Sequence, residues 1–296
     1  MFFLRPSFQE SLTSFMTPPI LYKYCTPSGI DILRNSRLKI TPPNQFNDPF
    51  ELAPRMQEEL TREQALEVLT EPRILNATYQ HLVKCNQFVG TISNFLAMLR
   101  HYSERAIQDL IKSYPASATE FRENHVNNIS AEFGLLCLSE VEKDILMWSH
   151  YTKSHTGFVL GFHTSDAFFA NPPLQQVVYA EERVLVTHSV RQNDPQRAKT
   201  VNSLIRRKSV HWKYEKEWRQ LHFLGQCAKE RDEKAGRFHH YKSFDPTLIA
   251  KVIIGCRSTN EPEIRELLSD TKFERVEVVK YQMHDSEFAL VPSNAG

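Results

Sequence analysis

Hydrophobic positions follow two different spacings along the chain, and each spacing predicts a different element. Short apolar runs that end at turn-forming or helix-breaking residues predict β-strands, whereas apolar positions three or four residues apart predict amphipathic helices. Strand-like runs lie on both sides of a long block rich in Glu, Gln, Arg, Leu and Ala. The predicted strands cover residues 21–24, 38–41, 133–138, 157–163, 176–179, 217–223, 250–254 and 276–281.

Helices are predicted between these strands. A short helix at residues 27–35 has Ser28 as its N-cap, because a hydroxyl can accept a bond from a free amide at a helix start. The block at about 55–130 contains several helices, which break near Pro72 and Pro115. Further helices are expected around residues 147–151, at 194–208 and at 261–268, and the charged stretch 229–237 is expected to be a solvated loop.

This order of elements predicts the fold class. Short strands with helices between them predict an α+β fold. The absence of an internal repeat and of a low-complexity linker favours one domain with an insertion over two independent domains. We expect an N-terminal arm at residues 1–20, a single α+β domain at 21–285 with a helical insertion at about 55–130, and a C-terminal tail at 286–296.

Charge and cysteine content restrict the classes of partner. The 296 residues include 36 Lys and Arg against 35 Asp and Glu, so no global field attracts the chain to nucleic acid or to an anionic membrane. No apolar run approaches the ~20 residues of a membrane helix, and the N-terminus lacks a signal-peptide pattern. The five cysteines are widely spaced and form no C-x-x-C pair. They predict buried, reduced thiols in a cytoplasmic protein without a membrane partner.

Familiar cofactor motifs are absent from the sequence. None of the nine glycines forms a G-x-G-x-x-G motif or a phosphate-binding loop, which disfavours Rossmann and P-loop chemistry. There is no H-E-x-x-H and no Cys or His cluster with zinc spacing, so no metal is expected. A G-x-S-x-G elbow is also missing, which removes the most recognisable sign of a serine hydrolase.

Two polar and aromatic segments near the N-terminus form a first candidate site. They are residues 21–25, LYKYC, and residues 44–51, NQFNDPFE. Asn47, Asp48 and Pro49 predict a turn, because an Asx side chain bonds the backbone two residues on and proline fixes φ. A turn that only joins two elements is an equal alternative to a functional role.

A second candidate lies in residues 139–157, where Trp148, His150 and Tyr151 fall within one helical turn. Aromatic residues at this spacing are more often part of a core than of a pocket. The accompanying hydroxyl and imidazole groups nevertheless leave more polar atoms than a dry core accepts. A pocket and a core therefore both remain open for this segment.

The third candidate is residues 211–222, HWKYEKEWRQLH. If a strand begins here, alternation places Glu215, Glu217 and Arg219 on one face. A surface strand with an ordinary Glu–Arg pair is one interpretation. The other is a glutamate oriented by the arginine beside a second glutamate of different pKa, an arrangement suited to holding a hydroxyl or stabilising a cationic transition state.

Taken together, these segments resemble a bacterial family catalogued as domain of unknown function 2971, over about residues 20–285. The layout in turn resembles the ADP-ribosyltransferase superfamily, a split mixed or antiparallel β-sheet fold. The resemblance implies that NAD is the substrate. The segments that carry it are LYKY, FNDPFE, LSE, MWSHY with a downstream Gly, VVY, YEKEWR and VIIG.

The resemblance also implies roles for single residues. Glu217 would stabilise the oxocarbenium-like state, Glu215 would complete an E-x-E motif, and either Tyr151 or Ser139 would fill the middle-strand position. Tyr24 or Tyr151 would stack on nicotinamide, Lys23 or Arg219 would contact pyrophosphate, and Asn47 with Asp48 would shape the pocket edge. The implied catalytic residues are Glu217, Glu215 and Tyr151, and the implied NAD-contacting residues are Tyr22, Lys23, Tyr24, Asn47, Asp48, Ser139, Trp148, His150 and Arg219.

By the same resemblance, the protein would be a toxin or phage-defence effector that modifies a macromolecular target, with the helical insertion recognising that target. An antitoxin or a defence-system protein would be its partner. One alternative is a nucleic-acid-binding or processing defence protein, and another is a non-enzymatic interaction module with a degenerate pocket. The first alternative would use a basic and aromatic stripe formed by Arg206, Arg207, Lys208, His211, Trp212 and Lys213. Because the net charge is near zero, we expect this stripe to be partly structural, with Trp212 buried and only some of the cations exposed.

Overall fold

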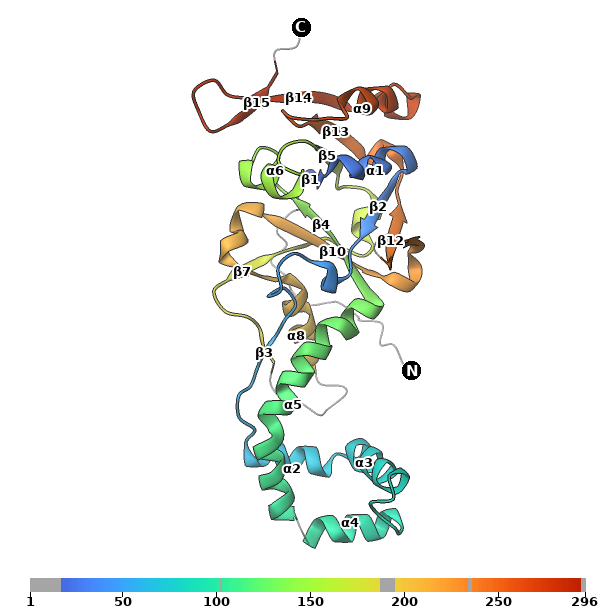
Figure 1. Ribbon diagram of the computed structural model, residues 1–296, viewed down its shortest axis with the longest axis vertical. Coiled ribbons are helices and arrows are strands. Elements are labelled where there is room, and N and C mark those ends of the chain that lie inside the picture. The colour runs from blue at the N-terminus through green and yellow to red at the C-terminus, as the bar shows by residue number, and fades with distance from the viewer. Residues whose placement is uncertain (1–16, 102, 187–194, 234–235, 294–296) are drawn as a thin grey trace. The chain divides into compact units, whose positions relative to one another are not determined.

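The computed structural model describes residues 17–101, 103–186, 195–233 and 236–293 (Figure 1). The chain divides into two compact units, each of which contains segments that are distant in sequence. Unit 1 consists of residues 1–51, 127–182 and 206–296, and unit 2 consists of residues 52–126 and 183–205.

Unit 1 is built on a mixed eight-stranded sheet. Its strands are β1 (Ile20–Cys25), β4 (Phe133–Ser139), β5 (Phe158–His163), β6 (Gln175–Gln176), β10 (Glu217–Phe223), β13 (Ile249–Ile254), β14 (Glu277–Met283) and β15 (Leu290–Pro292). They are ordered β15-β14-β13-β5-β1-β4-β10-β6. Only β13 and β14 pair in parallel, and the other neighbours are antiparallel. A mixed sheet with several helices agrees with the predicted α+β class.

The ladder between the two central strands is interrupted. β1 pairs with β5 along its whole length, and β4 does the same with β10. Between β1 and β4, in contrast, the register contains the single pair Tyr22–Ser139. The ammonium of Lys23 donates to the carbonyl oxygen of Cys137 at 3.0 Å and so links the two strands by a side chain. The sheet is therefore divided into two halves between β1 and β4.

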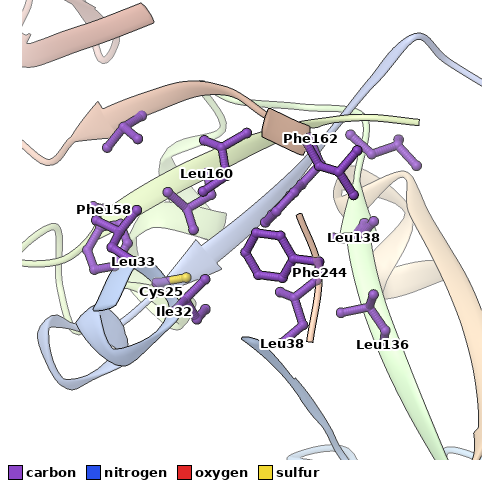
Figure 2. Close-up of a cluster of buried hydrophobic side chains, with 14 of the residues drawn as sticks. Cys25, Ile32, Leu33, Leu38, Leu136, Leu138, Phe158, Leu160, Phe162 and Phe244 are labelled. Carbon is purple, nitrogen blue, oxygen red and sulfur yellow. The ribbon is translucent and has the colours of Figure 1, made fainter. Parts of the chain in front are cut away.

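The main core lies on one face of this sheet. Phe158, Leu160 and Phe162 from β5 pack there with Leu33 and Phe244, all of them buried, as Figure 2 shows. The α-helices that contribute to this core are short. They are α1 (Asp31–Asn35), α7 (Ala167–Ala170) and α9 (Glu261–Leu268).

The opposite face carries a smaller core under helix α6 (Ile145–Tyr151). Trp148 is fully buried and packs edge-on against Tyr24 and at a tilt against Tyr281. The Asp144 carboxylate caps the helix by accepting bonds from the two amides of Leu146 and Met147. This capping starts the helix at Ile145. The helix that the sequence predicts around residues 147–151 is confirmed.

A three-stranded antiparallel sheet completes the main core. It consists of β2 (Arg37–Ile40), β11 (Ala228–Asp232) and β12 (Arg237–Ser243), in the order β11-β12-β2. The prediction of a loop at 229–237 is therefore wrong over most of its length. Strand β11, with the sequence AKERD, carries polar side chains on both faces, so the segment has none of the apolar alternation that usually reveals a strand.

Three further expectations need correction. Ser28 is not the N-cap of the first helix: Pro27 occupies its first position, so Thr26 is the cap residue, and it makes no side-chain capping bond. The expected tail contributes β15 to the sheet. All five cysteines are free, but only Cys25 is buried, and Cys85 is exposed.

Unit 2 contains most of the helical block. Its core is formed by Leu60, Ala65, Ile107 and Tyr114. Helix α5 continues through Pro115, where a break was predicted. The elements are α2 (Arg62–Thr70), α3 (Pro72–Lys84), α4 (Ile92–His101), most of α5 (Ser103–Glu132), most of α8 (Pro195–Arg206), and the parallel pair β3 (Arg55–Met56) and β8 (Leu185–Val186).

The remaining elements of unit 1 are short. The predicted strand at 176–179 is two strands, because Val177 separates β6 from β7. In the described part of the chain, no helix has both the length and the apolar character needed to cross a membrane. The short elements are β7 (Val178–Ala180) and β9 (Arg207–Ser209), which pair in parallel, and the 3-10 helices Pro27–Ile30, Pro43–Gln45, Val210–Glu215, Leu224–Gln226, Pro246–Leu248 and Thr271–Phe273.

We expect Gly157→Ala to destabilise unit 1 by about 1–3 kcal/mol, the usual cost of overpacking. A Cβ at Gly157 would lie 2.0 Å from the carbonyl oxygen of Cys25, and backbone atoms cannot move aside without distorting β1. Gly225→Ala is the control, because no atom lies within 4 Å of its Cβ position. Urea unfolding measures both, and an equal effect of the two substitutions would contradict this reading of the contact.

Candidate functional site

Three residues form a row across the central strands at the division of the sheet. Tyr22 on β1 pairs with Ser139 on β4, and Ser139 pairs in turn with Glu217 on β10. Their neighbours Leu21, Leu138 and Trp218 belong to the main core. Because strand residues alternate between faces, the row lies on the opposite face.

A cavity of about 330 Å³ opens on this face. All three residues of the row line it, together with side chains from α6 and from the loop before unit 2. The candidate residues that line it are Tyr22, Lys23, Tyr24, Asn47, Ser139, His150, Tyr151, Glu215 and Glu217. Further lining residues are Thr41, Gln45, Phe46, Glu51, Leu135, Cys137, Leu138, Met147 and Lys208.

Three other candidates do not line the cavity. Asp48 is buried in its turn, where its carboxylate accepts a bond from the Phe50 amide. Trp148 belongs to the core under α6 and has no exposed surface. Arg219 is 1% exposed, behind the carboxylates that it binds. The expectation that these three side chains line the same cavity as the other candidates is therefore wrong, whereas their contacts with NAD stay a prediction.

The cavity wall contains a network of buried ion pairs. The guanidinium of Arg219 donates from Nε to Glu217 Oε1 at 2.8 Å and from Nη2 to Glu217 Oε2 at 3.0 Å, and it also binds Glu51. The ammonium of Lys208 donates to Glu215 Oε2 at 2.5 Å and to Glu217 Oε2 at 3.0 Å, and lies 3.2 Å from Glu51 Oε1. We call these five residues the carboxylate network.

The two glutamates of the E-x-E motif differ in their electrostatics. Burial alone would raise the pKa of Glu217, but the charges of Arg219 and Lys208 outweigh it and hold that pKa well below its usual range. Burial also raises the pKa of Glu215, and Lys208 offsets this only in part. Glu217 therefore stays ionised at neutral pH, and of these two glutamates Glu215 takes up a proton first as the pH falls.

Helix α6 brings a hydroxyl to Glu215. The Tyr151 hydroxyl donates to Glu215 Oε1 at 2.6 Å, so the two oxygens of that carboxylate have different partners. Ser139 contributes through the backbone instead: its hydroxyl donates to the carbonyl oxygen of Glu215 at 2.6 Å. Tyr151 from α6 and Ser139 from β4, the two candidates for the middle-strand position, therefore both bind Glu215.

The end of α6 is fixed by strained backbone. Lys153, Ser154 and His155 all have positive φ, at 53°, 55° and 67°. Non-glycine residues in this region cost roughly 1–2 kcal/mol each. The His155 ring stacks on Trp148 with an angle of 10° between the ring planes, which ties the turn to the core. Such strain is found where the surrounding structure needs one fixed geometry.

Glu215 does not reach the site on a strand. Residues 210–215 form a 3-10 helix, Lys216 has φ of 43°, and β10 begins only at Glu217. The predicted alternation from Tyr214 is therefore wrong before Glu217. The left-handed residue turns the chain, which places Glu215 and Glu217 against the same ammonium. The Tyr179 hydroxyl accepts a bond from the Glu217 amide at 2.8 Å and holds this turn in place.

Comparison with known families gives one match. Residues 147–220 match a family model described as a protein of unknown function, DUF2971. The match spans about a quarter of the chain and includes most of α6, the 3-10 helix at 210–215 and the start of β10. A search of the curated proteins and a search of the solved structures found no match. The DUF2971 segment thus contains the residues around Tyr151, Glu215 and Glu217.

Sequence reasoning missed two members of the network. Glu51 ends the FNDPFE segment and was not assigned a role of its own. Lys208 was placed in a basic stripe, yet it is buried among carboxylates. Trp212 of the same stripe is only half-buried, which corrects the expectation of a buried ring. Without Lys208 the stripe is not a continuous cationic surface.

The network is an ionic cluster rather than a metal centre. Within the described ranges, no group of three or more His, Cys, Asp or Glu side chains is arranged to hold a metal ion. The three carboxylates of the network instead face two basic side chains. One negative charge is left over at the cavity wall when all five groups are ionised.

Proposed function

We propose that the protein is an NAD-dependent ADP-ribosyltransferase-like enzyme. The observation that carries this proposal is the row Tyr22–Ser139–Glu217 at the division of the sheet, with a cavity on its exposed side. Resemblance to the ADP-ribosyltransferase superfamily implies a first-strand, a middle-strand and a late-strand residue on a split sheet. The row supplies one residue for each position, and Ser139 is the one that lies on the middle strand.

The cavity suits the nicotinamide end of NAD. Its volume of about 330 Å³ lies at the lower end of the range for ligand sites. The excess negative charge of the carboxylate network complements the positive pyridinium ring. Tyr22, Tyr24, Phe46 and Tyr151 supply aromatic groups on the lining, and such groups favour a flat cation.

The pyrophosphate has a different environment. Arg219 is enclosed by carboxylates and cannot meet a phosphate. Of the two cations that sequence analysis offered for this contact, Lys23 remains, and it lines the cavity. To bind phosphate it would exchange its bond to the Cys137 carbonyl oxygen for a charged acceptor.

In the proposed reaction, the bond between ribose C1′ and the nicotinamide nitrogen breaks. Both electrons of that bond leave with the nitrogen, which becomes neutral, and the ribose becomes an oxocarbenium-like cation. The ionised Glu217 stabilises this cation by its charge. The Arg219 fork keeps Glu217 ionised and fixes the direction of its carboxylate.

Glu215 serves as the base in the second half of the reaction. A hydroxyl, amine or water attacks C1′, forms the new bond and releases one proton. Glu215 accepts that proton, since its raised pKa makes it the readier of the two glutamates to do so. The Tyr151 hydroxyl holds the Glu215 carboxylate in place for this transfer.

The wider role follows from the proposed chemistry. We propose a cytoplasmic toxin or phage-defence effector that transfers ADP-ribose to a macromolecule. Unit 2 would recognise the target, because its helices contain none of the groups assigned to the chemistry. An antitoxin or a defence-system protein would keep the activity in check.

The direct test is release of nicotinamide from NAD by the full-length protein, with labelled NAD and bacterial lysate to detect transfer. Release of nicotinamide together with a labelled macromolecule supports the transferase. Absence of NAD binding at millimolar concentration rejects the proposal. In that case, binding of single-stranded nucleic acid would support the nucleic-acid alternative, and its absence the interaction module.

We expect Tyr151→Phe to move the acid limb of the activity–pH profile to higher pH. The lost hydroxyl stabilises the ionised form of Glu215, so its removal raises the pKa of Glu215 further, and the base is lost at a higher pH as the solution is acidified. Stability should fall by about 1–3 kcal/mol because a buried carboxylate oxygen loses its donor. The profile of kcat/KM against pH is the measurement.

The matched control for this substitution is Tyr281→Phe. The Tyr281 hydroxyl is also buried and donates to a glutamate, Glu142, at 2.9 Å, but neither residue lines the cavity. A similar loss of stability with an unchanged pH profile is expected. An unchanged profile in Tyr151→Phe as well would contradict the link between Tyr151 and the base.

A further inference from the structure

Lys208 contacts every carboxylate of the carboxylate network. Its ammonium lies 2.5 Å from Glu215, 3.0 Å from Glu217 and 3.2 Å from Glu51. The ammonium donates hydrogen bonds to Glu215 and Glu217, and Glu51 is its third ionic partner. Lys208 lies on the cavity lining, but its side chain is only 4% exposed and its ammonium is engaged with carboxylates. Any effect of Lys208 on a reaction therefore acts through the glutamates.

The two glutamates depend on Lys208 to different degrees. Glu217 also receives both arms of the Arg219 guanidinium. Glu215 is held by Lys208 on one oxygen and by the neutral hydroxyl of Tyr151 on the other. Loss of the ammonium would therefore leave Glu217 with a strong cationic partner and Glu215 with a neutral donor only.

We propose that Lys208 is a positioning residue that holds Glu215 and Glu217 in one hydrogen-bonded unit and divides their tasks between a fixed anion and a proton acceptor. The catalytic consequence of this inference rests on the proposed function. The arrangement of the unit itself does not, because it can be measured in the protein without a substrate.

The charges around Glu215 explain the division. With Lys208 the network has three anions and two cations, and without it three anions face Arg219 alone. The second uncompensated charge favours protonation of the carboxylate that lacks a guanidinium. The groups that face Glu215 are Lys208 from β9, Glu217 from β10, Tyr151 from α6, Tyr179 from β7 and Tyr214 from the 3-10 helix, with Glu51 and Arg219 beyond Lys208.

The experiment compares Lys208→Met with a charge-balanced double variant. Lys208→Met removes the cation and is expected to weaken folding, because it leaves buried carboxylates uncompensated. Lys208→Met combined with Glu51→Gln removes one cation and one anion, so the total charge of the network stays as in the wild type. The single variant Glu51→Gln is the reference for the double variant, since the two then differ only at Lys208.

Two measurements on the full-length protein are needed. The titration of the Glu215 carboxyl is followed by NMR of ¹³C-labelled glutamate, with Glu215→Gln to assign the signal. The profile of kcat/KM against pH is followed by nicotinamide release. Thermal unfolding is recorded beside both.

We expect the double variant to be more stable than Lys208→Met, but we do not expect it to restore the protonation midpoint of Glu215. Its Glu215 midpoint should lie at higher pH than in Glu51→Gln, and kcat/KM on the acid limb should fall about 10-fold or more. Lys208→Arg keeps the charge and should keep the midpoint near that of the wild type. The inference would be overturned if Glu215 had the same protonation midpoint in Glu51→Gln and in the double variant. It would also be overturned if Lys208→Arg shifted this midpoint as far as Lys208→Met does.

Failure of the proposed function gives a different result. If the wild type releases no nicotinamide, the transferase proposal fails, while the NMR titration still decides whether Lys208 controls Glu215. If the wild type is active and the midpoints do not differ, the transferase proposal stands and Lys208 is only a structural counter-ion.

Discussion

Glu217→Gln is expected to reduce the release of nicotinamide from NAD by about 10²–10³-fold, the typical effect of one preorganised electrostatic contact. The amide keeps the size of the side chain but removes the charge that would stabilise the oxocarbenium-like cation. The fold should persist, because two anions, Glu51 and Glu215, then balance two cations, Lys208 and Arg219. Single-turnover rates at saturating NAD measure the effect.

Glu261→Gln is the matched control for this substitution. The Glu261 carboxylate is likewise held by two cations, Lys280 and Arg265, but it is only half-buried and lies outside the cavity lining. It should lose stability without a change in rate. Equal turnover by the wild type and Glu217→Gln, with NAD still consumed, would remove Glu217 from the mechanism and leave Glu215 as the carboxylate to test.

Arg219→Met is expected to lower the free energy of unfolding by about 3–5 kcal/mol, the usual cost of removing one partner from a buried ion pair. The guanidinium is 1% exposed and holds Glu217 and Glu51, which would face Lys208 alone. All three tryptophans, Trp148, Trp212 and Trp218, lie in unit 1. Tryptophan fluorescence in urea therefore reports the unfolding of this unit.

The loss of unfolding free energy in Arg219→Met should depend on pH in a defined direction. In the wild type, Arg219 contributes to the depressed pKa of Glu217, so the associated stability is present at neutral pH and is lost as acid protonates the carboxylate. The difference in unfolding free energy between wild type and variant should become smaller as the pH falls below the ordinary glutamate pKa of ~4.3. Arg275→Met is the control, because Arg275 is 92% exposed and should change stability by less than about 0.5 kcal/mol. A constant gap down to acid pH would contradict this account.

Elements with strong local signals were predictable from the sequence. The strand at Glu217–Phe223 and the helix at Glu261–Leu268 are confirmed with their predicted bounds. A short run of strand-favouring residues between turns reveals the strand, and the helical spacing of apolar residues reveals the helix. Arg37–Ile40 and Ile249–Ile254 were found to within a residue for the same reason.

The carboxylate network was only partly predictable, because its pairs join residues that are distant in sequence. Glu217 and Arg219 stand two positions apart on a strand, so alternation places them together. Lys208 follows two arginines, and nothing local indicates that its partner Glu51 lies 157 positions earlier. The turn at Lys216 was also hidden, since lysine rarely adopts a positive φ.

The position of Glu51 and Lys208 along the chain also matters for how the gene can change. Glu51 is the last residue before the chain enters unit 2, and Lys208 follows its final return to unit 1 by only a few residues. The ion pair between them therefore joins the two residues that flank the inserted segments in the sequence. A recombination event within residues 52–126 replaces part of unit 2 and keeps both Glu51 and Lys208. A recombination event that extends beyond Glu51 or Lys208 also removes a residue of the site, so the inserted sequence can be exchanged only between these two positions.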